Sequence, residues 1–479
     1  MKFAPPEKSH ARIWKPALLF LLFLCVILSA TAETEGFSIE DERLLGKEFI
    51  ARVARTFRFL ENDTATQYLR DLGTYLGSFV DNKPFELNFY ILHNPELNAF
   101  AAPGGHIFIN TGLILEMENA DELAAVLTHE IAHVTARHLA QRIAQHQKLA
   151  VGTLAGVLAG VLIGGEAAEA LIAGSVAASM QAQLHYSRND ERHADQLGFD
   201  SMLKSGFQPE AMIGILGKIT RSQWEGGPHR VPGYLRTHPA GPERMSNLEV
   251  LMSRGREPAA LSRSETFRNL FPSFQVIVAA TSLSPVEAEK SFRRMLSAAF
   301  SSREKSLAHL GLGIALGARA RYADAVEHLQ ASIAMADQPE PALIALGNIH
   351  RTAGNPREAI SVLDRVLMAD SNNPVALYLT GLCYQQMERY DQAVRYFERL
   401  AAVEYHKDDV FYQLGVAYGR LDELALAHFY FGRYFARISQ GPEILFHFRK
   451  AEELAKDQPR LLDRIRREMQ REGLAPGRG

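Results

Sequence analysis

The chain has 479 residues, of which 47% are hydrophobic and 22% are charged, and its formal net charge is −3. This composition is typical of a folded soluble protein with two or three domains and a sizeable core. A near-neutral charge gives no indication of nucleic-acid binding, so we predict no nucleic acid among its partners.

The first 32 residues have the pattern of a secretory signal peptide. Four basic residues precede the apolar run PALLFLLFLCVILS, and the small-residue site Ala30-Thr31-Ala32 follows it. The run is shorter than the ~20 residues that a membrane-spanning helix needs. We therefore predict export to the periplasm with cleavage after Ala32, in preference to an uncleaved membrane anchor. Cys383 would then be the remaining cysteine, so intrachain disulfides cannot stabilise the mature chain.

The next elements are a helical region and two strands. Residues 40–80 carry helical periodicity, and FELNFYIL (85–92) alternates in the manner of a strand. GGHIFINTGLI (104–114) follows a Pro-Gly-Gly turn and predicts a second strand, whose edge we expect to be open to an extended substrate. A helix capped by Asn119 or Asp121 should follow. Two further helices and a Gly- and Pro-rich loop are predicted at residues 183–205, 209–220 and 221–243.

The stretch VLTHEIAHVTARHLA (126–140) places His129 and His133 four positions apart, with Glu130 between them. Positions i and i+4 share one face of a helix, so both imidazoles can bind one ion. Glu130 lies beside that face and can reach a water on the metal, as in the H-E-x-x-H arrangement of zinc hydrolases. An ordinary helix with surface histidines is the alternative. The apolar neighbours favour buried histidines, which need partners.

A catalytic zinc commonly takes a third protein ligand. His138 and His146 lie on other faces if the helix continues, and we expect both to be exposed. In SRNDERHADQLGFD, Glu191 can be the third ligand, and Asp195 can accept the free N–H of a ligand histidine. A solvated charged helix face is the alternative interpretation of this segment. His193 is expected at the surface.

Residues 149–182 form an apolar insert rich in glycine and alanine, with Glu166 and Glu169 as its charged residues. One interpretation is a small-residue helical hairpin packed inside the protein. The other is an element that contacts substrate or the membrane surface, because exposed apolar patches usually mark contacts. A third interpretation is a helical hairpin that spans the membrane.

The C-terminal half repeats with a period of 34 residues. This is the tetratricopeptide period, in which small residues let two antiparallel helices approach and a bulky residue fills the gap to the next pair. Such arrays bind extended or helical peptides. The small and bulky positions that recur are Gly313, Gly347, Gly381 and Gly415, then Ala325, Ala359, Ala393 and Ala427, and finally Leu329, Leu363, Phe397 and Phe431.

The segments HEIAHVTARH, SRNDERHAD and NPELNAFAAPGGHIFINTGL together resemble the gluzincin metallopeptidases of the HtpX/Oma-related family. With a signal peptide and a repeat tail, the chain resembles the periplasmic members of this family that act in outer-membrane β-barrel assembly. The resemblance implies one Zn²⁺ per subunit on His129, His133 and Glu191, with Glu130 as the general base. Asp195 matches the family aspartate, for which we favour an orienting role.

The same resemblance extends to RTHPAGPER (236–244). In the relatives, the histidine that matches His238 can occupy the open position of the metal and hold the enzyme shut. An exposed loop histidine is the alternative. Arg244 can hold this loop or stabilise developing negative charge. The relatives often carry disulfide-forming cysteines, so redox-linked behaviour is in doubt in a mature chain that keeps only Cys383.

The expected fold is mainly α. A zincin-like α+β metallopeptidase domain with a small sheet should be followed by an α-solenoid of tetratricopeptide repeats. The predicted divisions are a signal peptide (1–32), the peptidase domain (33–265), connecting helices (266–304), the repeats (305–440) and capping helices with a tail (441–479).

The expected function is that of a periplasmic zinc endopeptidase that degrades misassembled outer-membrane proteins and also assists their assembly. Its partners would be unfolded or stalled outer-membrane β-barrel proteins and, through the repeats, the barrel assembly machinery. Residues 149–182 would supply any peripheral membrane contact. The alternative is a chaperone or adaptor whose metal site is largely silent or self-inhibited.

Overall fold

The computed structural model describes residues 37–146, 154–156, 158, 160, 162, 186–225, 232–239, 242–402, 409–438 and 441–474. The predicted signal peptide and most of the insert at 149–182 lie outside these residues. Among the helices of the described ranges, none combines the length and hydropathy that a membrane-spanning helix requires.

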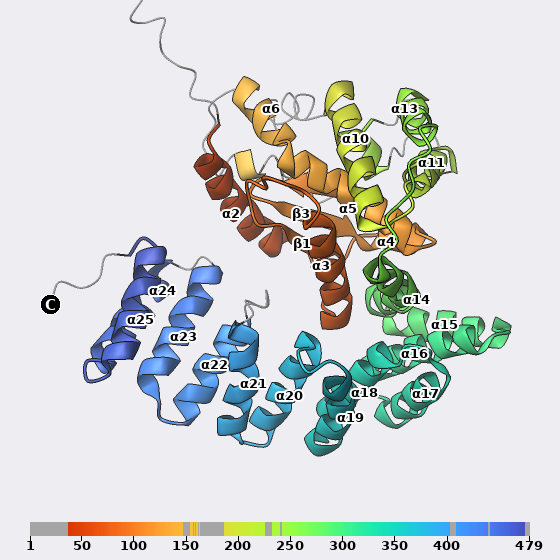
Figure 1. Ribbon diagram of the computed structural model, residues 1–479. Coiled ribbons are helices and arrows are strands. Elements are labelled where there is room, and N and C mark those ends of the chain that lie inside the picture. The colour runs from red at the N-terminus through yellow and green to blue at the C-terminus, as the bar shows by residue number, and fades with distance from the viewer. Residues whose placement is uncertain are drawn as a thin grey trace, which may run out of the picture.

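A three-stranded sheet forms the centre of the N-terminal half (Figure 1). β3 lies between the other two strands, parallel to β1 and antiparallel to β2. The expectation that GGHIFIN offers an open edge is therefore wrong, because both sides of β3 are paired. Strand β2 was not predicted from the sequence, because its four residues are all buried and so show no alternation. The strands are β1 (Asn88–Leu92), β2 (Ala99–Ala102) and β3 (His106–Asn110).

Helix α5 (Ala120–Thr135) is buried from Ala120 to Val134. It packs against the sheet and against neighbouring helices on its other sides. The side chain of Asn119 accepts a hydrogen bond from the backbone N–H of Glu122 and caps the helix. The second cap candidate, Asp121, instead pairs with Arg268. The other helices of this half are α2 (Ile39–Thr56), α3 (Asp63–Gly77), α4 (Thr111–Glu116), α6 (His138–His146), α10 (Arg188–Ser205), α11 (Glu210–Glu225), α12 (Gly233–Thr237) and α13 (Pro242–Met252).

The long loop predicted at 221–243 is in part helical, and that prediction was wrong for α12 and the end of α11. Helix α12 is held against the sheet, because the N–H of Tyr234 donates to the carbonyl oxygen of Leu97 at 3.1 Å and the Tyr234 ring is buried. This tertiary contact stabilises a turn of helix in a segment whose glycines and prolines predict a loop.

The described residues of the apolar insert are packed inside the protein. Leu154, Ala155, Leu158 and Leu162 belong to one buried cluster with residues of α2 and β3. The side-chain amide of Asn98 also donates to the carbonyl oxygen of Leu162 at 2.7 Å. These contacts support the packed interpretation for this part of the insert.

The C-terminal half is a curved array of paired helices that follows α14 and α15. Figure 1 shows it as an arc from α15 to α25 beneath the sheet-containing half, in touch with α3 through α14 and α20. The helices are α14 (Ser262–Ser282), α15 (Pro285–Ala298), α16 (Ser302–Ala318), α17 (Tyr322–Met335), α18 (Glu340–Thr352), α19 (Pro356–Ala369), α20 (Pro374–Gln386), α21 (Tyr390–Ala402), α22 (Asp409–Arg420), α23 (Leu424–Arg437), α24 (Gly441–Leu454) and α25 (Pro459–Arg471).

The repeated glycines lie at the closest approach of each helix pair. A Cβ atom added at Gly313 would come within 2.4 Å of Leu329, and one at Gly381 within 2.6 Å of Phe397. The bulky residue thus fills space inside its own pair, and the prediction that it fills the gap to the next pair was wrong. Gly432 and Phe448 extend the same contact to α23 and α24. At the end of the array, α25 buries Ile465 and Met469.

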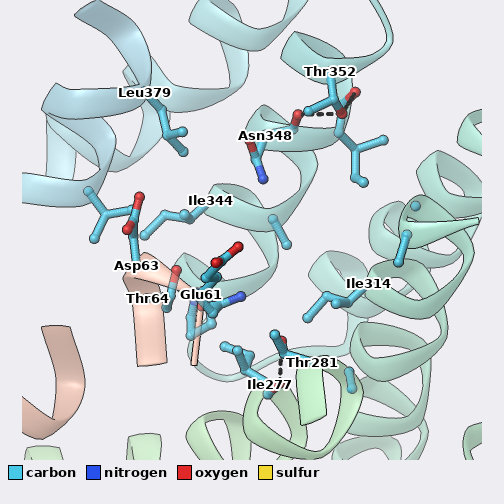
Figure 2. A pocket seen from close by; sticks show the side chains of 18 of the residues that line it. Glu61, Asp63, Thr64, Ile277, Thr281, Ile314, Ile344, Asn348, Thr352 and Leu379 are labelled. Carbon is cyan, nitrogen blue, oxygen red and sulfur yellow. Dashed lines mark hydrogen bonds between the residues drawn. The ribbon is translucent and has the colours of Figure 1, made fainter. Parts of the chain in front are cut away.

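A groove of about 1120 Å³ separates the two halves. Its floor includes Ile314, Ile344 and Leu379 on the inner helices of the array, as Figure 2 shows. Glu61, from the connection between α2 and α3, and Asp63, the first residue of α3, line the groove from the peptidase half. The groove therefore combines an apolar floor with charged residues of both signs, which include Arg58 and Arg351.

Candidate metal centre

Helix α5 places His129 and His133 on one buried face. Their Nε2 atoms lie 3.0 Å apart, and both side chains are almost fully buried. Glu191 reaches the same point from α10, with Oε2 at 3.5 Å from His129 Nε2 and Oε1 at 3.5 Å from His133 Nε2. The structure thus joins two segments that are some sixty residues apart in the chain.

His238 completes the cluster from the segment that follows α12. Its Nδ1 atom lies 3.0 Å from Glu191 Oε1 and 3.4 Å from His129 Nε2. These four residues each offer one ligand atom, and the atoms all lie within 4.8 Å of one another. Four ligands at zinc–ligand distances of about 2.0–2.1 Å are about 3.3 Å apart in a tetrahedron. The atom pairs given above lie 3.0–3.5 Å apart.

Glu130 follows His129 on α5 and is fully buried. Within the described ranges, neither of its carboxylate oxygens has a hydrogen-bond partner. The nearest basic group is His238, whose Nε2 lies 3.5 Å from Glu130 Oε1. Burying a carboxylate without hydrogen bonds costs folding free energy, so a functional role for Glu130 explains its place here.

Asp195 and Arg244 hold the outer side of the cluster. His129 Nδ1 lies 2.9 Å from Asp195 Oδ1, within ion-pair distance of this carboxylate. Arg244, on α13, donates two hydrogen bonds to Asp195 at 2.9 and 2.7 Å, and its Nη1 lies 2.6 Å from Glu191 Oε2. The guanidinium therefore joins the carboxylate that faces the centre to the carboxylate behind His129.

The electrostatics of the cluster favour a cation. Burial raises the pKa of Asp195, but Arg244 and His129 lower it further, to about 2. Burial lowers the pKa of His129, but its contacts with Asp195 and Glu191 raise it to about 9. A histidine binds a metal as the neutral imidazole, so metal binding displaces the proton of His129. The carboxylates of Glu130, Glu191 and Asp195 then outnumber the one guanidinium by two charges. A divalent ion balances this excess, so the residues present fit a metal.

His138 is buried, and the expectation that it is exposed was wrong. Its Nδ1 lies 3.0 Å from Nδ1 of His133, and burial lowers the pKa of His138 to about 4. The expectation assumed one continuous helix. Instead, α5 ends at Thr135, Arg137 adopts a left-handed conformation (φ 53°), and α6 begins in a new direction. His193 is exposed as predicted, and the side chain of His146 lies outside the described residues.

Two tyrosines that the sequence analysis did not single out enclose the cluster. The Tyr186 ring stacks on His133 with centroids 3.9 Å apart, and the Tyr234 ring stacks on His238 at 4.5 Å. Both are buried, and burial raises the pKa of each hydroxyl well above its usual range. No motif spacing predicts them, because Tyr186 lies between His133 and Glu191 in the chain and Tyr234 lies between Glu191 and His238.

Two models of known protein families match this chain, one in each half. A model of peptidase family M48 matches residues 70–251, and a model of anaphase-promoting complex, cyclosome, subunit 3 matches residues 318–400. The chain is 27% identical to a beta-barrel assembly-enhancing protease of Yersinia pestis over 80% of its own length and 82% of that protein. It is 28% identical to the Escherichia coli protein of the same name over 50% of its own length and 49% of that protein.

A third relative is the mitochondrial metalloendopeptidase OMA1 of Saccharomyces cerevisiae, which is 27% identical over 41% of this chain and 56% of that protein. The match to the M48 model covers α5, α10 and α13, which carry the histidine pair, Glu191 and Arg244. This protein is therefore a metalloendopeptidase in which a domain that matches peptidase family M48 is followed by an array of tetratricopeptide type.

Proposed function

We propose that the protein is a zinc-dependent endopeptidase in which His129, His133 and Glu191 hold the ion. The observation that carries this proposal is the convergence of two imidazole Nε2 atoms and one carboxylate at a buried, negatively charged point. Two histidines and one glutamate are a common ligand set for catalytic zinc. When bound, zinc lowers the pKa of its water toward ~7 and polarises a carbonyl group.

Glu130 acts as the general base in this proposal. Its buried carboxylate adjoins the histidine pair, and neither oxygen is hydrogen-bonded within the described residues. It takes a proton from the attacking water and later delivers it to the leaving amine. Asp195 holds the Nδ1 proton of His129, so that Nε2 keeps its lone pair for the metal. Arg244 keeps Glu191 and Asp195 in place.

His238 occupies the space beside Glu130 that the attacking water and the substrate carbonyl would need. Its Nδ1 belongs to the ligand cluster, and its Nε2 lies 3.5 Å from Glu130. We propose that this arrangement is a closed state in which His238 takes the fourth ligand position. Cleavage then requires the segment that carries His238 to move away. His238→Ala should raise basal proteolysis.

We propose that the substrates are misassembled outer-membrane β-barrel proteins in the periplasm. The names of the Yersinia pestis and Escherichia coli relatives support this choice. The groove between the two halves supports a binding role beside proteolysis, because its apolar floor suits a segment with apolar side chains. The same groove favours, as a second candidate function, a chaperone or adaptor whose peptidase is self-inhibited.

The test is metal analysis of the purified protein together with the variants Glu191→Ala and Glu130→Gln. We expect about one zinc ion per chain in the parent and in Glu130→Gln, and loss of zinc in Glu191→Ala. Unfolded casein should be cleaved by the parent alone. If the parent protein binds zinc but neither the parent nor His238→Ala cleaves casein, the chaperone or adaptor function is supported instead.

A further inference from the structure

His129 and His133 turn their Nε2 atoms toward the candidate metal centre, and their Nδ1 atoms contact different partners. His129 Nδ1 lies 2.9 Å from the Asp195 carboxylate. His133 Nδ1 lies 3.0 Å from Nδ1 of His138, and His138 Nε2 lies 3.1 Å from Nδ1 of His193. Three imidazoles thus form a chain from the candidate metal centre to the exposed side chain of His193.

We propose that His138 is the positioning residue for His133, and that His193 holds His138 in the tautomer this task requires. The inference rests on the proposed metal site and deepens it. Metal-binding histidines usually donate their outer N–H to a carboxylate or a backbone carbonyl. Here the outer nitrogen of His129 lies beside the Asp195 carboxylate, whereas a pair of histidines occupies the corresponding place behind His133.

The tautomers follow from the positions of the nitrogens. A neutral His133 that binds a metal through Nε2 carries its proton on Nδ1. That N–H donates to His138 Nδ1, which must therefore be unprotonated. A neutral His138 then carries its proton on Nε2 and donates it to His193 Nδ1. One metal bond thus determines the tautomers of three rings, with every N–H pointing away from the metal.

The surroundings hold these rings in place. His138 is the first residue of α6, and Arg142, one turn later, donates a 3.0 Å hydrogen bond to Asp190 on α10. This ion pair ties the helix that carries His138 to the helix that carries His193. On its other side, His133 stacks on the Tyr186 ring. The His133 imidazole can therefore not rotate without breaking a hydrogen bond or a stacking contact.

His138 acts through His133 and is not itself a ligand. Its Nδ1 approaches the nitrogen of His133 that is turned away from the centre. The four residues whose ligand atoms cluster are His129, His133, Glu191 and His238. The role of His138 is therefore separable from that of the ligands, and the expected effect of its loss is weaker metal binding rather than a missing ligand.

The test measures zinc affinity in the full-length protein by competition with a chromophoric chelator. Second-sphere partners of this kind change metal affinity by about 10–100-fold, so His138→Ala should weaken zinc binding by that factor. His138→Asn should recover most of the affinity, because the asparagine side-chain oxygen can accept the His133 N–H. His193→Ala, at an exposed position, should cause a smaller loss. His350→Ala, on α18, is the matched control with parental affinity.

A second readout distinguishes positioning from general loss of structure. The visible absorption spectrum of the Co²⁺-substituted protein should shift in His138→Ala and return to the parental form in His138→Asn. Parental affinity and spectrum in His138→Ala, or equal defects in the alanine and asparagine variants, would overturn the inference. If His138→Ala does not fold, parental zinc affinity in His193→Ala would overturn it. A parent without zinc would instead defeat the proposed function itself.

Discussion

The peptidase half and the helical array depend on contacts of very different range. In the peptidase half, side chains between His129 and Arg244 meet around one point, and they arrive from α5, α10, α13 and the segment after α12. In the array, Gly381 contacts Phe397 within one helix pair, and the same contact recurs pair after pair. A single substitution at the metal centre should therefore disturb the whole site, whereas a substitution in the array should disturb one helix pair and its neighbours.

The largest expected effect is a loss of peptide cleavage that leaves the helical array unchanged. Glu130→Gln should lower the rate of casein cleavage by about 10²–10⁴-fold, because an amide cannot take the proton of the attacking water. Zinc content and the thermal unfolding of the array should not change. Glu116→Gln, an exposed glutamate of α4, is the control. Normal cleavage by Glu130→Gln would contradict the assignment of the general base.

The next effect concerns the stability of the centre. Arg244→Leu removes the cation that contacts both Glu191 and Asp195 in a buried place. Removing one partner of a buried ion pair costs about 3–5 kcal/mol of unfolding free energy. Urea denaturation followed by circular dichroism measures the loss. Arg256→Leu, whose pair with Asp200 is partly exposed, should cost less than about 1 kcal/mol. Equal costs for the two variants would show that burial of the Arg244 pair is unimportant.

A smaller effect tests the array. A Cβ atom at Gly381 would lie 2.6 Å from a ring carbon of Phe397, so Gly381→Ala forces the helix pair apart. Overpacking of this kind costs about 1–3 kcal/mol. Gly441→Ala is the matched control, since no described atom lies within 4 Å of its new methyl group. The unfolding midpoint should fall for Gly381→Ala alone, while zinc content stays parental. A loss of zinc in Gly381→Ala would contradict the independence of the two halves.

The smallest effect is a pH dependence of the array. His428 and His447 join α23 to α24 with their Nδ1 atoms 2.9 Å apart, so one ring must accept from the other. Burial and His428 lower the pKa of His447 to about 4, against the opposing effect of Glu443. Burial and Lys450 also lower the pKa of His428.

Because the folded pair has lower pKa values than free histidine, it stabilises the array above pH ~6.5 and loses that contribution as the pH falls toward 4. The urea midpoint should therefore be lower at pH 5 than at pH 7.5. In His447→Gln, this difference should become smaller. An unchanged pH dependence in the variant would show that the pair does not contribute.

Helical geometry alone made several features predictable. The spacing of His129 and His133 forces both onto one helix face, and the Asn119 cap follows from the preference of helix ends for a side-chain acceptor. The repeated glycines also required no tertiary knowledge, because each acts within one pair of consecutive helices. Even there, only the structure showed that the bulky residue contacts the glycine of its own pair.

Other features depended on where distant segments meet. The short strand β2 is buried on both faces and so lacks the alternation by which a strand is recognised. The placement of His138 depended on a single left-handed residue, Arg137, which ends the continuous helix assumed from the pattern.

Taken by itself, the sequence determined the elements whose contacts are local: the H-E-x-x-H helix and the 34-residue helix pairs. The tertiary structure decided that Glu191 and His238 meet that helix, that β3 has no free edge, and that three histidines line up behind His133. The physical reason is range. Helical periodicity relates neighbours along the chain, whereas the approach of α10 and the segment after α12 depends on how whole surfaces pack.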